Sequence, residues 1–317
     1  MVVSSKRVKK LASIASLPLM TMSLTACKDL ALFDSKGPVG QAIGDTMIYT
    51  VLLMLIVVIP TIFLSVYIPY KYRAGNDKAE FKPEWSHSNI IEMIVWGIPI
   101  AIIAILGVEA YKTSHSLDPH KEIVSPNNPQ ERPLKIQVVA LDWKWLFIYP
   151  EEGIATVNEI AVPVDKPVQF LLTSDAAINS FFIPRLGGQL YAMSGMENKL
   201  NLLADEEGVY KGISSNYSGF GFSGMRFNVL AKDKAGYDAW VNGVKNSGST
   251  LDDATYAKLK IKSRDNPVEY YVNEDPLRFK DIIDENAGLN QPAPAAHHGD
   301  AHGEAHSEDS HGKADAH

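Results

Sequence analysis

Two long apolar stretches in the first part of the chain constrain its fold more than any other feature. The first, at 46–70, carries no charged residue, and the second, at 88–111, carries only Glu92 and Glu109. A helix needs about 20 mostly apolar residues to cross the roughly 30 Å hydrocarbon core of a bilayer, and both stretches are long enough. The sequence therefore predicts two transmembrane helices joined by a polar loop at 71–87.

A basic segment and then an apolar run precede these stretches. Residues 6–10 hold four lysine or arginine side chains, and small residues follow the apolar run just before Cys27. This order is typical of a secretory signal peptide. The ending Leu-Thr-Ala-Cys resembles a bacterial lipobox, which implies removal of 1–26 and attachment of diacylglycerol and an acyl lipid to Cys27; a chance cysteine is the alternative. Because Cys27 is the only cysteine, acylation would leave no free thiol.

Basic residues near the two stretches predict the side of the membrane on which each segment lies. The loop at 71–87 holds four lysine or arginine residues, whereas the segment at 27–45 holds two. Because basic loops favour the cytoplasmic side, we expect 27–45 and everything after 111 to lie in the periplasm. The expected location is the inner membrane of a Gram-negative-type bacterium. The net charge of -7 offers no basic surface for nucleic acid.

The chain beyond the second stretch shows the periodicity of β structure. Short apolar or alternating runs are separated by Pro, Gly, Asn and Asp, which is the pattern of a β-sandwich. The predicted strands are Leu134–Ala140, Trp143–Tyr149, Ala155–Val162, Pro167–Thr173, Ser180–Ile183, Lys199–Leu203 and Met225–Ala231. Apolar residues at helical spacing predict helices at 234–245 and 252–260. We therefore expect a membrane-anchored all-β protein with a soluble domain at 112–231 and a helical extension at 232–290.

The last segment, 291–317, differs in composition from the rest. It is rich in Ala, Gly, His, Asp and Glu, and it holds six of the nine histidines. Such a segment lacks the apolar residues that would bury surface, so we predict a disordered tail. Imidazole is a common metal ligand, and a membrane lipoprotein that binds metal through this tail is one alternative.

Four segments resemble subunit II of haem-copper oxidases. They are Trp-Ser-His-Ser-Asn at 85–89, Asp-Trp-Lys-Trp at 142–145, Asn-Ser-Phe-Phe-Ile-Pro-Arg-Leu-Gly at 179–187 and Tyr-Ser-Gly-Phe-Gly-Phe-Ser-Gly-Met at 217–225. The last two resemble the quinol-oxidising branch, in particular the cytochrome bo-type ubiquinol oxidases. The resemblance covers about residues 27–285 and implies a cupredoxin-like sandwich for the soluble domain.

The resemblance also identifies the positions of a degenerate copper site. In the cytochrome c oxidase branch this domain binds the binuclear CuA centre through two Cys, two His, a Glu carbonyl and a Met. The corresponding positions here are Asn179, Ser214, Asn216, Ser218, Phe222 and Met225. Hydroxyl groups are hard donors that stay protonated, and they replace poorly the thiolates that select copper. We expect no metal here, a loop held by packing and by hydrogen bonds from the two serines and Asn216, and Phe222 filling the vacated space.

Four aromatic residues, among them Trp143 and Trp145, alternate along a predicted strand and so share one face of the sheet. Core packing is the ordinary explanation for such a row. We interpret Trp143 and Trp145 as a docking surface toward subunit I, because without copper no electrons pass through this face.

Glu92 is the charge that most suggests a function in the membrane part. Sixteen residues separate Glu92 from Glu109, about 24 Å as a helix, so at least one carboxylate lies at or inside the membrane boundary. The resemblance implies that Glu92 lies at the entrance of the K-channel for proton uptake, whose body is in subunit I. An interfacial glutamate without a role is the alternative.

The resemblance implies a subunit that carries no redox centre of its own. The predicted function is subunit II of a proton-pumping terminal quinol oxidase, bracing subunit I, which would hold the haems and a copper ion. Subunits III and IV are further expected partners, ubiquinol is reached through subunit I, and cytochrome c is not a partner. The alternatives are menaquinol as the reductant and a CuA-bearing cytochrome c oxidase, which the missing thiolates disfavour.

Overall fold

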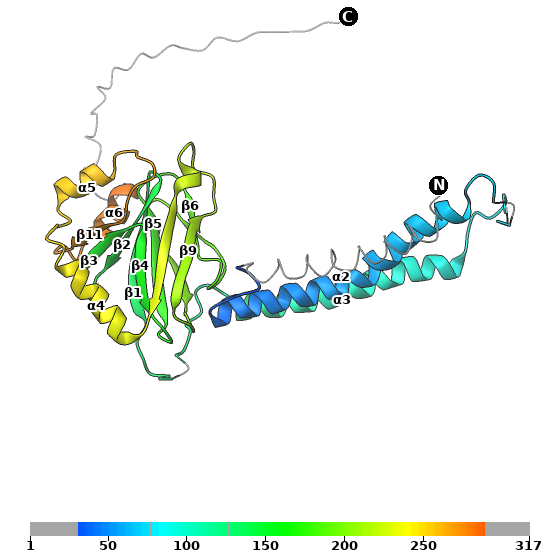
Figure 1. Cartoon of the computed structure of the whole chain (residues 1–317), viewed down its shortest axis with the longest axis horizontal. Helices are drawn as coiled ribbons and strands as arrows, with labels where there is room; N and C mark the ends of the chain where they lie inside the picture. Colours follow the sequence, from blue (N-terminus) through cyan, green and yellow to red (C-terminus); the bar gives the residue numbers. More distant parts are fainter. Residues whose placement is uncertain (1–30, 77, 81, 126, 289–317) are drawn as a thin grey trace, which may run out of the picture.

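A pair of long helices forms the membrane part of the molecule. The computed structural model describes residues 31–76, 78–80, 82–125 and 127–288. The helices are α2 (Pro38–Lys71) and α3 (Asn89–Ser116), which run side by side away from the rest of the chain (Figure 1). Their most apolar windows have mean hydropathies of 2.8 and 2.4, and most of their large apolar side chains are exposed. Both predicted membrane helices are confirmed.

Both helices are longer than the sequence predicts. α2 begins at Pro38 rather than at 46, and α3 ends at Ser116 rather than at 111. Pro38 occupies a first-turn position, where the N–H that proline lacks has no helical partner. An apolar run marks the part of a helix that suits lipid, whereas the helix itself continues as long as its backbone hydrogen bonds do.

The soluble part is a sandwich of two β-sheets. One sheet has the order β11-β3-β2-β1-β5-β8 and comprises β1 (Leu134–Leu141), β2 (Lys144–Tyr149), β3 (Ile154–Val157), β5 (Val168–Ser174), β8 (Asn198–Leu202) and β11 (Glu269–Val272). The other has the order β4-β10-β9-β6-β7 and comprises β4 (Glu159–Pro163), β6 (Asn179–Phe182), β7 (Leu190–Ala192), β9 (Gly208–Ser214) and β10 (Arg226–Lys232). The strands run crosswise to the hairpin, so loops at their ends project sideways from its axis (Figure 1).

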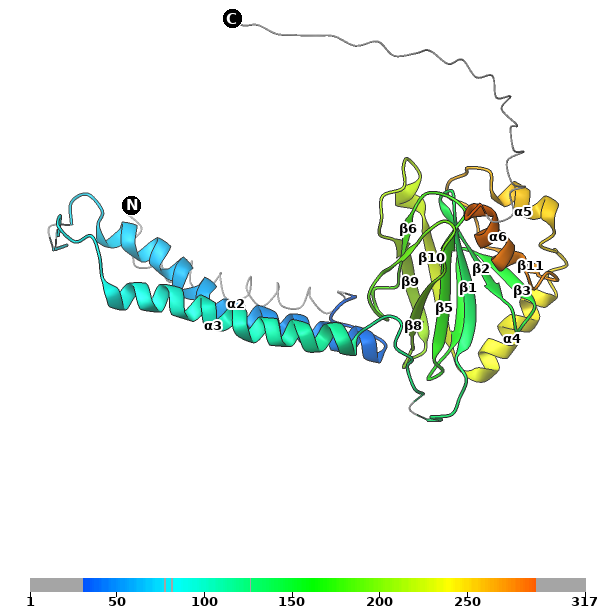
Figure 2. The same cartoon turned by 180° about the vertical axis from the view of Figure 1, so that it is seen from behind.

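Three helices gather at the end of the sandwich farthest from the hairpin (Figure 2). They are α4 (Lys234–Lys245), α5 (Asp253–Leu259) and α6 (Arg278–Asn286). The first two confirm the predicted helices. Each begins after an aspartate whose side chain accepts a backbone hydrogen bond, Asp233 from Gly236 and Asp252 from Thr255, as helix N-caps commonly do.

Two hydrophobic cores hold these layers together. The first lies between the sheets and contains Trp145, Phe147, Phe181 and Phe227, with the rings of the last two stacked at 5.0 Å. The second lies between the outer face of the β2 sheet and the C-terminal segment, where α5 and α6 pack. β2 is therefore buried on both faces and shows no alternation between buried and exposed residues.

The C-terminal segment completes the sandwich rather than following it. β11 pairs antiparallel with β3 and forms the edge of the larger sheet. β7, β9, β11 and α6 were absent from the prediction, and the predicted strand Ala155–Val162 is two strands. Asn158 separates them with a φ of 57°, a conformation that asparagine tolerates better than most residues.

The hairpin is fixed to the sandwich at a contact that we call the joint, formed by residues 34–41, 185–186 and 203–206. The Lys36 N–H donates to the Arg185 carbonyl at 2.7 Å, and the Gly40 N–H donates to the Leu186 carbonyl at 3.0 Å. Lys36 also forms an ion pair with Glu206 at 2.6 Å. At Gly37 a Cβ atom would lie 2.1 Å from the Leu203 carbonyl oxygen, so the backbones meet without room for a side chain.

Candidate functional site

The predicted copper-site positions gather at one end of the smaller sheet. Asn179 begins β6, and Ser214 ends β9 beside it. The Ser214 hydroxyl donates to Asn179 Oδ1 at 3.0 Å, and the two side chains are almost inaccessible to solvent, with relative exposures of 4% and 1% for the residues. Two positions that would hold a thiolate and an imidazole in a CuA domain are thus joined by a neutral hydrogen bond.

The loop from β9 to β10 is held by further hydrogen bonds and by packing. The Asn216 side-chain amide donates to the Ile178 carbonyl at 2.8 Å, and the Ser214 N–H donates to the Met225 carbonyl at 3.1 Å. Met225 is buried in the core between the sheets. The predicted bonds from Ser214 and Asn216, and the packing role of Met225, are confirmed.

Two predictions about this loop are wrong. The Ser218 hydroxyl is buried and has no hydrogen-bond partner among the described residues; the backbone carbonyl of Ser218 instead accepts from Trp143 Nε1 at 3.0 Å. Phe222 is only half-buried, and its ring packs edge to face against Tyr217 at 5.7 Å. A short 3₁₀ turn at Phe222–Gly224 holds this ring near the surface, so it covers the loop and does not fill the site.

This arrangement does not fit a CuA centre. The two thiolate positions are hydroxyls, and one of them already donates to the residue that stands in place of the first histidine. The second histidine position is a phenyl ring that faces Tyr217. No group of three or more His, Cys, Asp or Glu side chains converges anywhere in the described ranges. Binuclear copper needs bridging thiolates, and the residues at these positions supply none.

The predicted docking role of Trp145 is wrong, because its side chain lies in the core with 0% exposure. Trp145 lies on the inner face of β2, where it meets the Phe181 ring edge to face at 5.4 Å. Trp143 is not in the strand: it occupies the turn before β2, with a φ of 65°, and it is half-buried. Alternation identified the shared face of the later aromatics but did not show that this face points inward.

A different set of residues is exposed beside the loop. Tyr217 and Phe220 have relative exposures of 76% and 77%, and Ile178 adds a third exposed apolar side chain. Two cations stand over rings here, Arg264 at 4.5 Å from Phe220 and Lys262 at 6.0 Å from the Trp143 ring. We call these six residues the tip surface. The sequence analysis missed it because the segment at 217–225 was considered only as a ligand loop, although closely spaced aromatics in a loop are themselves a signal.

Glu92 lies in the first turn of α3, at the end of the hairpin far from the sandwich (Figure 1). Its carboxylate is 3.4 Å from His87 Nδ1, and both side chains are exposed on the isolated chain. The structure therefore separates Glu92 from the tip surface by the length of the hairpin. Cys27 and the six histidines at 291–317 lie outside the described residues.

Comparisons with known proteins agree with this arrangement. A family model described as the periplasmic domain of cytochrome c oxidase subunit II matches residues 151–231, and a model described as the COX aromatic-rich motif matches residues 245–288. Subunit 2 of the cytochrome bo(3) ubiquinol oxidase of Pseudomonas aeruginosa is 50% identical over 280 residues, 88% of this chain and 81% of that protein. Ubiquinol oxidase subunit 2 of Acetobacter aceti is 50% identical over 277 residues, 87% of this chain and 88% of that protein.

One solved structure that is similar to part of this chain is that of a periplasmic domain. It is that of subunit II of the cytochrome oxidase of Bradyrhizobium japonicum, which is 23% identical, with a TM-score of 0.35, over 36% of this chain and 95% of that chain. The sandwich, its membrane hairpin and the matched families together define a subunit II of the haem-copper oxidase class. Within that class, the chain belongs to the family of cytochrome bo3-type ubiquinol oxidase subunit 2. The predicted family, fold class and membership of an oxidase complex are confirmed.

Proposed function

We propose that this chain is the non-redox subunit of a proton-pumping quinol oxidase, and that it braces subunit I without passing electrons. The observation that carries the proposal is the Ser214–Asn179 hydrogen bond, which occupies two former ligand positions with a buried neutral pair. Quinol is soluble in lipid and can reach subunit I from within the membrane. A copper relay on the water side is therefore unnecessary, and the haems and copper of subunit I carry the reduction of oxygen to water.

This proposal is tested by purifying the complex through this chain. We expect subunits I, III and IV to co-purify, oxygen consumption with reduced ubiquinone, and none with reduced cytochrome c. Parallel assays with menaquinol identify the preferred quinone. Stoichiometric copper on this chain, together with turnover on cytochrome c, would refute the proposal.

We further propose that the tip surface contacts subunit I. The strands run crosswise to the hairpin, so loops at their ends project sideways from its axis (Figure 1). A partner that lies beside the hairpin in the membrane would therefore meet the loop between β9 and β10. Exposed aromatic residues flanked by cations are typical of the centre of protein interfaces. The contact would be made by Tyr217 and Phe220, with Arg264 facing an acidic group of the partner, whereas Lys262 already lies 3.8 Å from the Asp142 carboxylate.

The docking proposal is tested with Phe220→Ser. Truncation of a central aromatic residue at an interface commonly costs about 2 kcal/mol or more of binding free energy, so retention of subunit I during purification should fall. Val209→Ser is the matched control, because Val209 is also exposed, at the other end of β9. Equal recovery of subunit I in both variants would contradict the proposal.

We also propose that Glu92 shapes a proton entrance into subunit I. The support is its place in the first turn of α3, near the membrane boundary opposite the sandwich, within 3.4 Å of His87. Glu92→Gln should slow oxidase turnover and proton uptake while haem content stays normal. Glu109→Gln is the control at the opposite end of the same helix, where we expect turnover like the unmodified complex. Normal proton uptake in Glu92→Gln would show that the carboxylate is an interfacial residue without a role in proton entry.

Lipidation of Cys27 and the role of the histidine-rich tail complete the proposal. Mass spectrometry of the mature chain should find residues 1–26 removed and a diacylglycerol with an acyl group on Cys27. Deletion of 291–317 should leave assembly and turnover intact. Loss of metal binding together with loss of activity on that deletion would favour the metal-binding alternative.

A further inference from the structure

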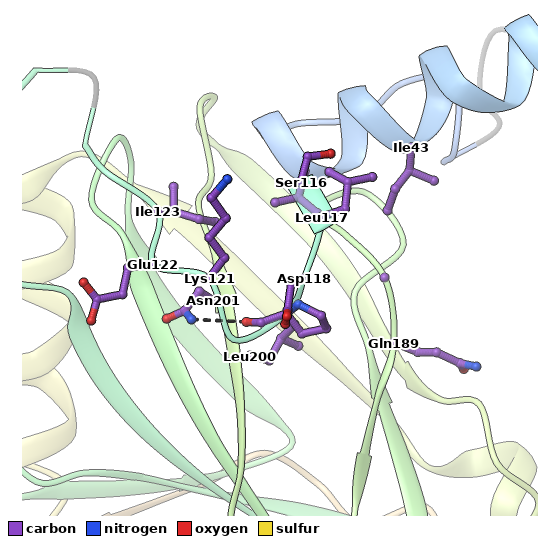
Figure 3. Close-up of a pocket in the computed structure, with 13 residues that line it drawn as sticks. Ile43, Ser116, Leu117, Asp118, Lys121, Glu122, Ile123, Gln189, Leu200 and Asn201 are labelled. Carbon is purple, nitrogen blue, oxygen red and sulfur yellow. Dashed lines mark hydrogen bonds between the residues drawn. The ribbon is translucent and has the colours of Figure 1, made fainter. Parts of the chain in front are cut away.

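A cavity of about 180 Å³ lies where the hairpin meets the sandwich. Its walls come from the first turns of α2, the segment that follows α3, and the edge strand β8, and Figure 3 shows these side chains around it. Because α2 begins and α3 ends here, the cavity lies at the periplasmic boundary of the membrane. None of the former copper-ligand positions lines it, although the lining residue Gln189 accepts a hydrogen bond from Ser215 of the neighbouring loop, and the proposed proton entrance lies at the other end of the hairpin.

The cavity wall changes from apolar to charged along its length. Val39, Ile43 and Leu117 form the wall on the hairpin side, and Asp118 and Lys121 contribute a carboxylate and an ammonium on the sandwich side. A surface that is apolar toward the membrane core and charged toward water matches the profile of a lipid at the headgroup level. Such amphipathic walls are typical of sites at a membrane boundary.

The two charged groups are held apart and do not neutralise each other. Asp118 Oδ1 accepts from the His120 N–H at 2.9 Å and lies 3.1 Å from His120 Nδ1. These contacts lower the pKa of Asp118, so its carboxylate stays ionised at neutral pH. No carboxylate oxygen among the described residues lies within 4 Å of Lys121 Nζ, and Figure 3 shows the Lys121 side chain extending toward the level of the hairpin.

We propose that this cavity binds the headgroup of one phosphatidylethanolamine molecule from the periplasmic leaflet. Its phosphate would pair with Lys121, its primary ammonium with Asp118, and its acyl chains would follow the apolar faces of α2 and α3. The headgroup would occupy the cavity, and the acyl chains would lie outside it along the helices. Charge-assisted hydrogen bonds of this kind are the strong ones in proteins.

The charges of the lining favour this lipid over an anionic one. Asp118 and Lys121 contribute one charge of each sign, and Glu122 adds a negative charge at the rim, where Figure 3 shows its carboxylate directed away from the other side chains. A headgroup with a phosphate alone would meet one cation and two carboxylates. A zwitterion offers a group of opposite sign to each of these charges: its phosphate to Lys121, which has no carboxylate within 4 Å among the described residues, and its ammonium to Asp118, whose carboxylate otherwise contacts only His120 in that part of the chain.

The proposal is tested by native mass spectrometry of the full chain in mild detergent. Phosphatidylethanolamine, phosphatidylglycerol and soluble glycerophosphoethanolamine are titrated separately. We expect one tightly bound phosphatidylethanolamine per chain and at least tenfold weaker binding of the other two. Lys121→Met should weaken the binding of phosphatidylethanolamine at least tenfold, whereas Lys135→Met, which removes an exposed lysine on β1 outside the cavity, should leave it unchanged.

Several outcomes would overturn the assignment. If phosphatidylglycerol bound as tightly as phosphatidylethanolamine, the site would not recognise the amine. If glycerophosphoethanolamine bound as tightly, the ligand would be a soluble molecule rather than a membrane lipid. Unchanged binding in Lys121→Met would exclude the cavity as the site. Ile43→Trp provides a second variant independent of charge, because the indole fills the apolar side and should displace the lipid while the thermal unfolding temperature of the chain is retained. Retained lipid in that variant also refutes the proposal.

Discussion

Ser214→Ala tests whether the former copper site is stabilised by its own polar pair. The substitution removes the hydroxyl that donates to Asn179 Oδ1 at 3.0 Å, and it leaves a buried acceptor without that donor. Replacement by alanine adds no atoms, so the loop has no new clash to relieve. The effect on stability therefore reports the hydrogen bond and the desolvation of the orphaned oxygen.

The magnitude follows from the burial of both partners. A buried polar group left without its partner costs about 1–3 kcal/mol of unfolding free energy. For a domain of this size each 1 kcal/mol shifts the unfolding temperature by about 2–4 °C, so we expect a decrease of about 2–12 °C. Asn179→Leu combined with Ser214→Ala removes both polar groups, and the double variant should lose less than the sum of the single variants, by about 0.5–3 kcal/mol.

The assay is thermal unfolding of the full chain in detergent, followed by near-ultraviolet circular dichroism. Ser223→Ala is the control, because Ser223 is exposed and its side chain makes no hydrogen bond in the described structure. A chelator should leave every unfolding temperature unchanged. An effect of Ser214→Ala below about 0.5 kcal/mol, or strict additivity in the double variant, would refute the reasoning, since surface substitutions commonly fall in that range.

Three further predictions concern the joint, the tip surface and the C-terminal helices. Gly37→Ala places a Cβ 2.1 Å from the Leu203 carbonyl oxygen and should destabilise the joint by about 1–3 kcal/mol, seen as faster hydrogen exchange at 34–41. Gly221→Ala places a Cβ 2.3 Å from the indole of Trp143, and it should weaken retention of subunit I as Phe220→Ser does. Burial and a 2.5 Å hydrogen bond to Asp175 raise the pKa of Tyr256, so the folded chain keeps a proton above about pH 10 that the unfolded chain loses. Stability should therefore fall as pH rises above about 10, and Tyr256→Phe should lessen that decline in unfolding temperatures measured at pH 8–11.

The sequence predicted the elements whose signal is local. The hairpin followed from the length of two apolar runs, and α4 followed from the helical spacing of its apolar residues. β11 was missed because it is a four-residue edge strand whose partner, β3, lies more than a hundred residues earlier in the chain. Pairing across such a distance leaves no periodic trace in a short segment, so tertiary context decides it.

The sequence predicted which residues form the candidate site, but it predicted only part of their arrangement. The motif located Asn179 and Ser214, and the chemistry of their side chains predicted the loss of copper. The orientation of Trp145 was wrong because β2 is covered on both faces, and alternation cannot distinguish two buried faces from a buried and an exposed one. Trp143 was misplaced because its positive φ puts it in the turn before the strand, which its residue type does not signal.

The joint also has a mechanical consequence. The backbone just before α2 and in its first turn is bonded to residues 185–186, and the segment after α3 is bonded to β8 through Asn201 and Pro119. The ectodomain is thus fixed to both helices at the same end of the hairpin, at the start of α2 and after the end of α3. Any rotation of the helices within the bilayer would therefore move the tip surface sideways over the membrane. A chimera that exchanges the hairpin alone would therefore misplace the tip surface relative to its partner. A chimera that exchanges the hairpin and the ectodomain together would keep the position of the tip surface.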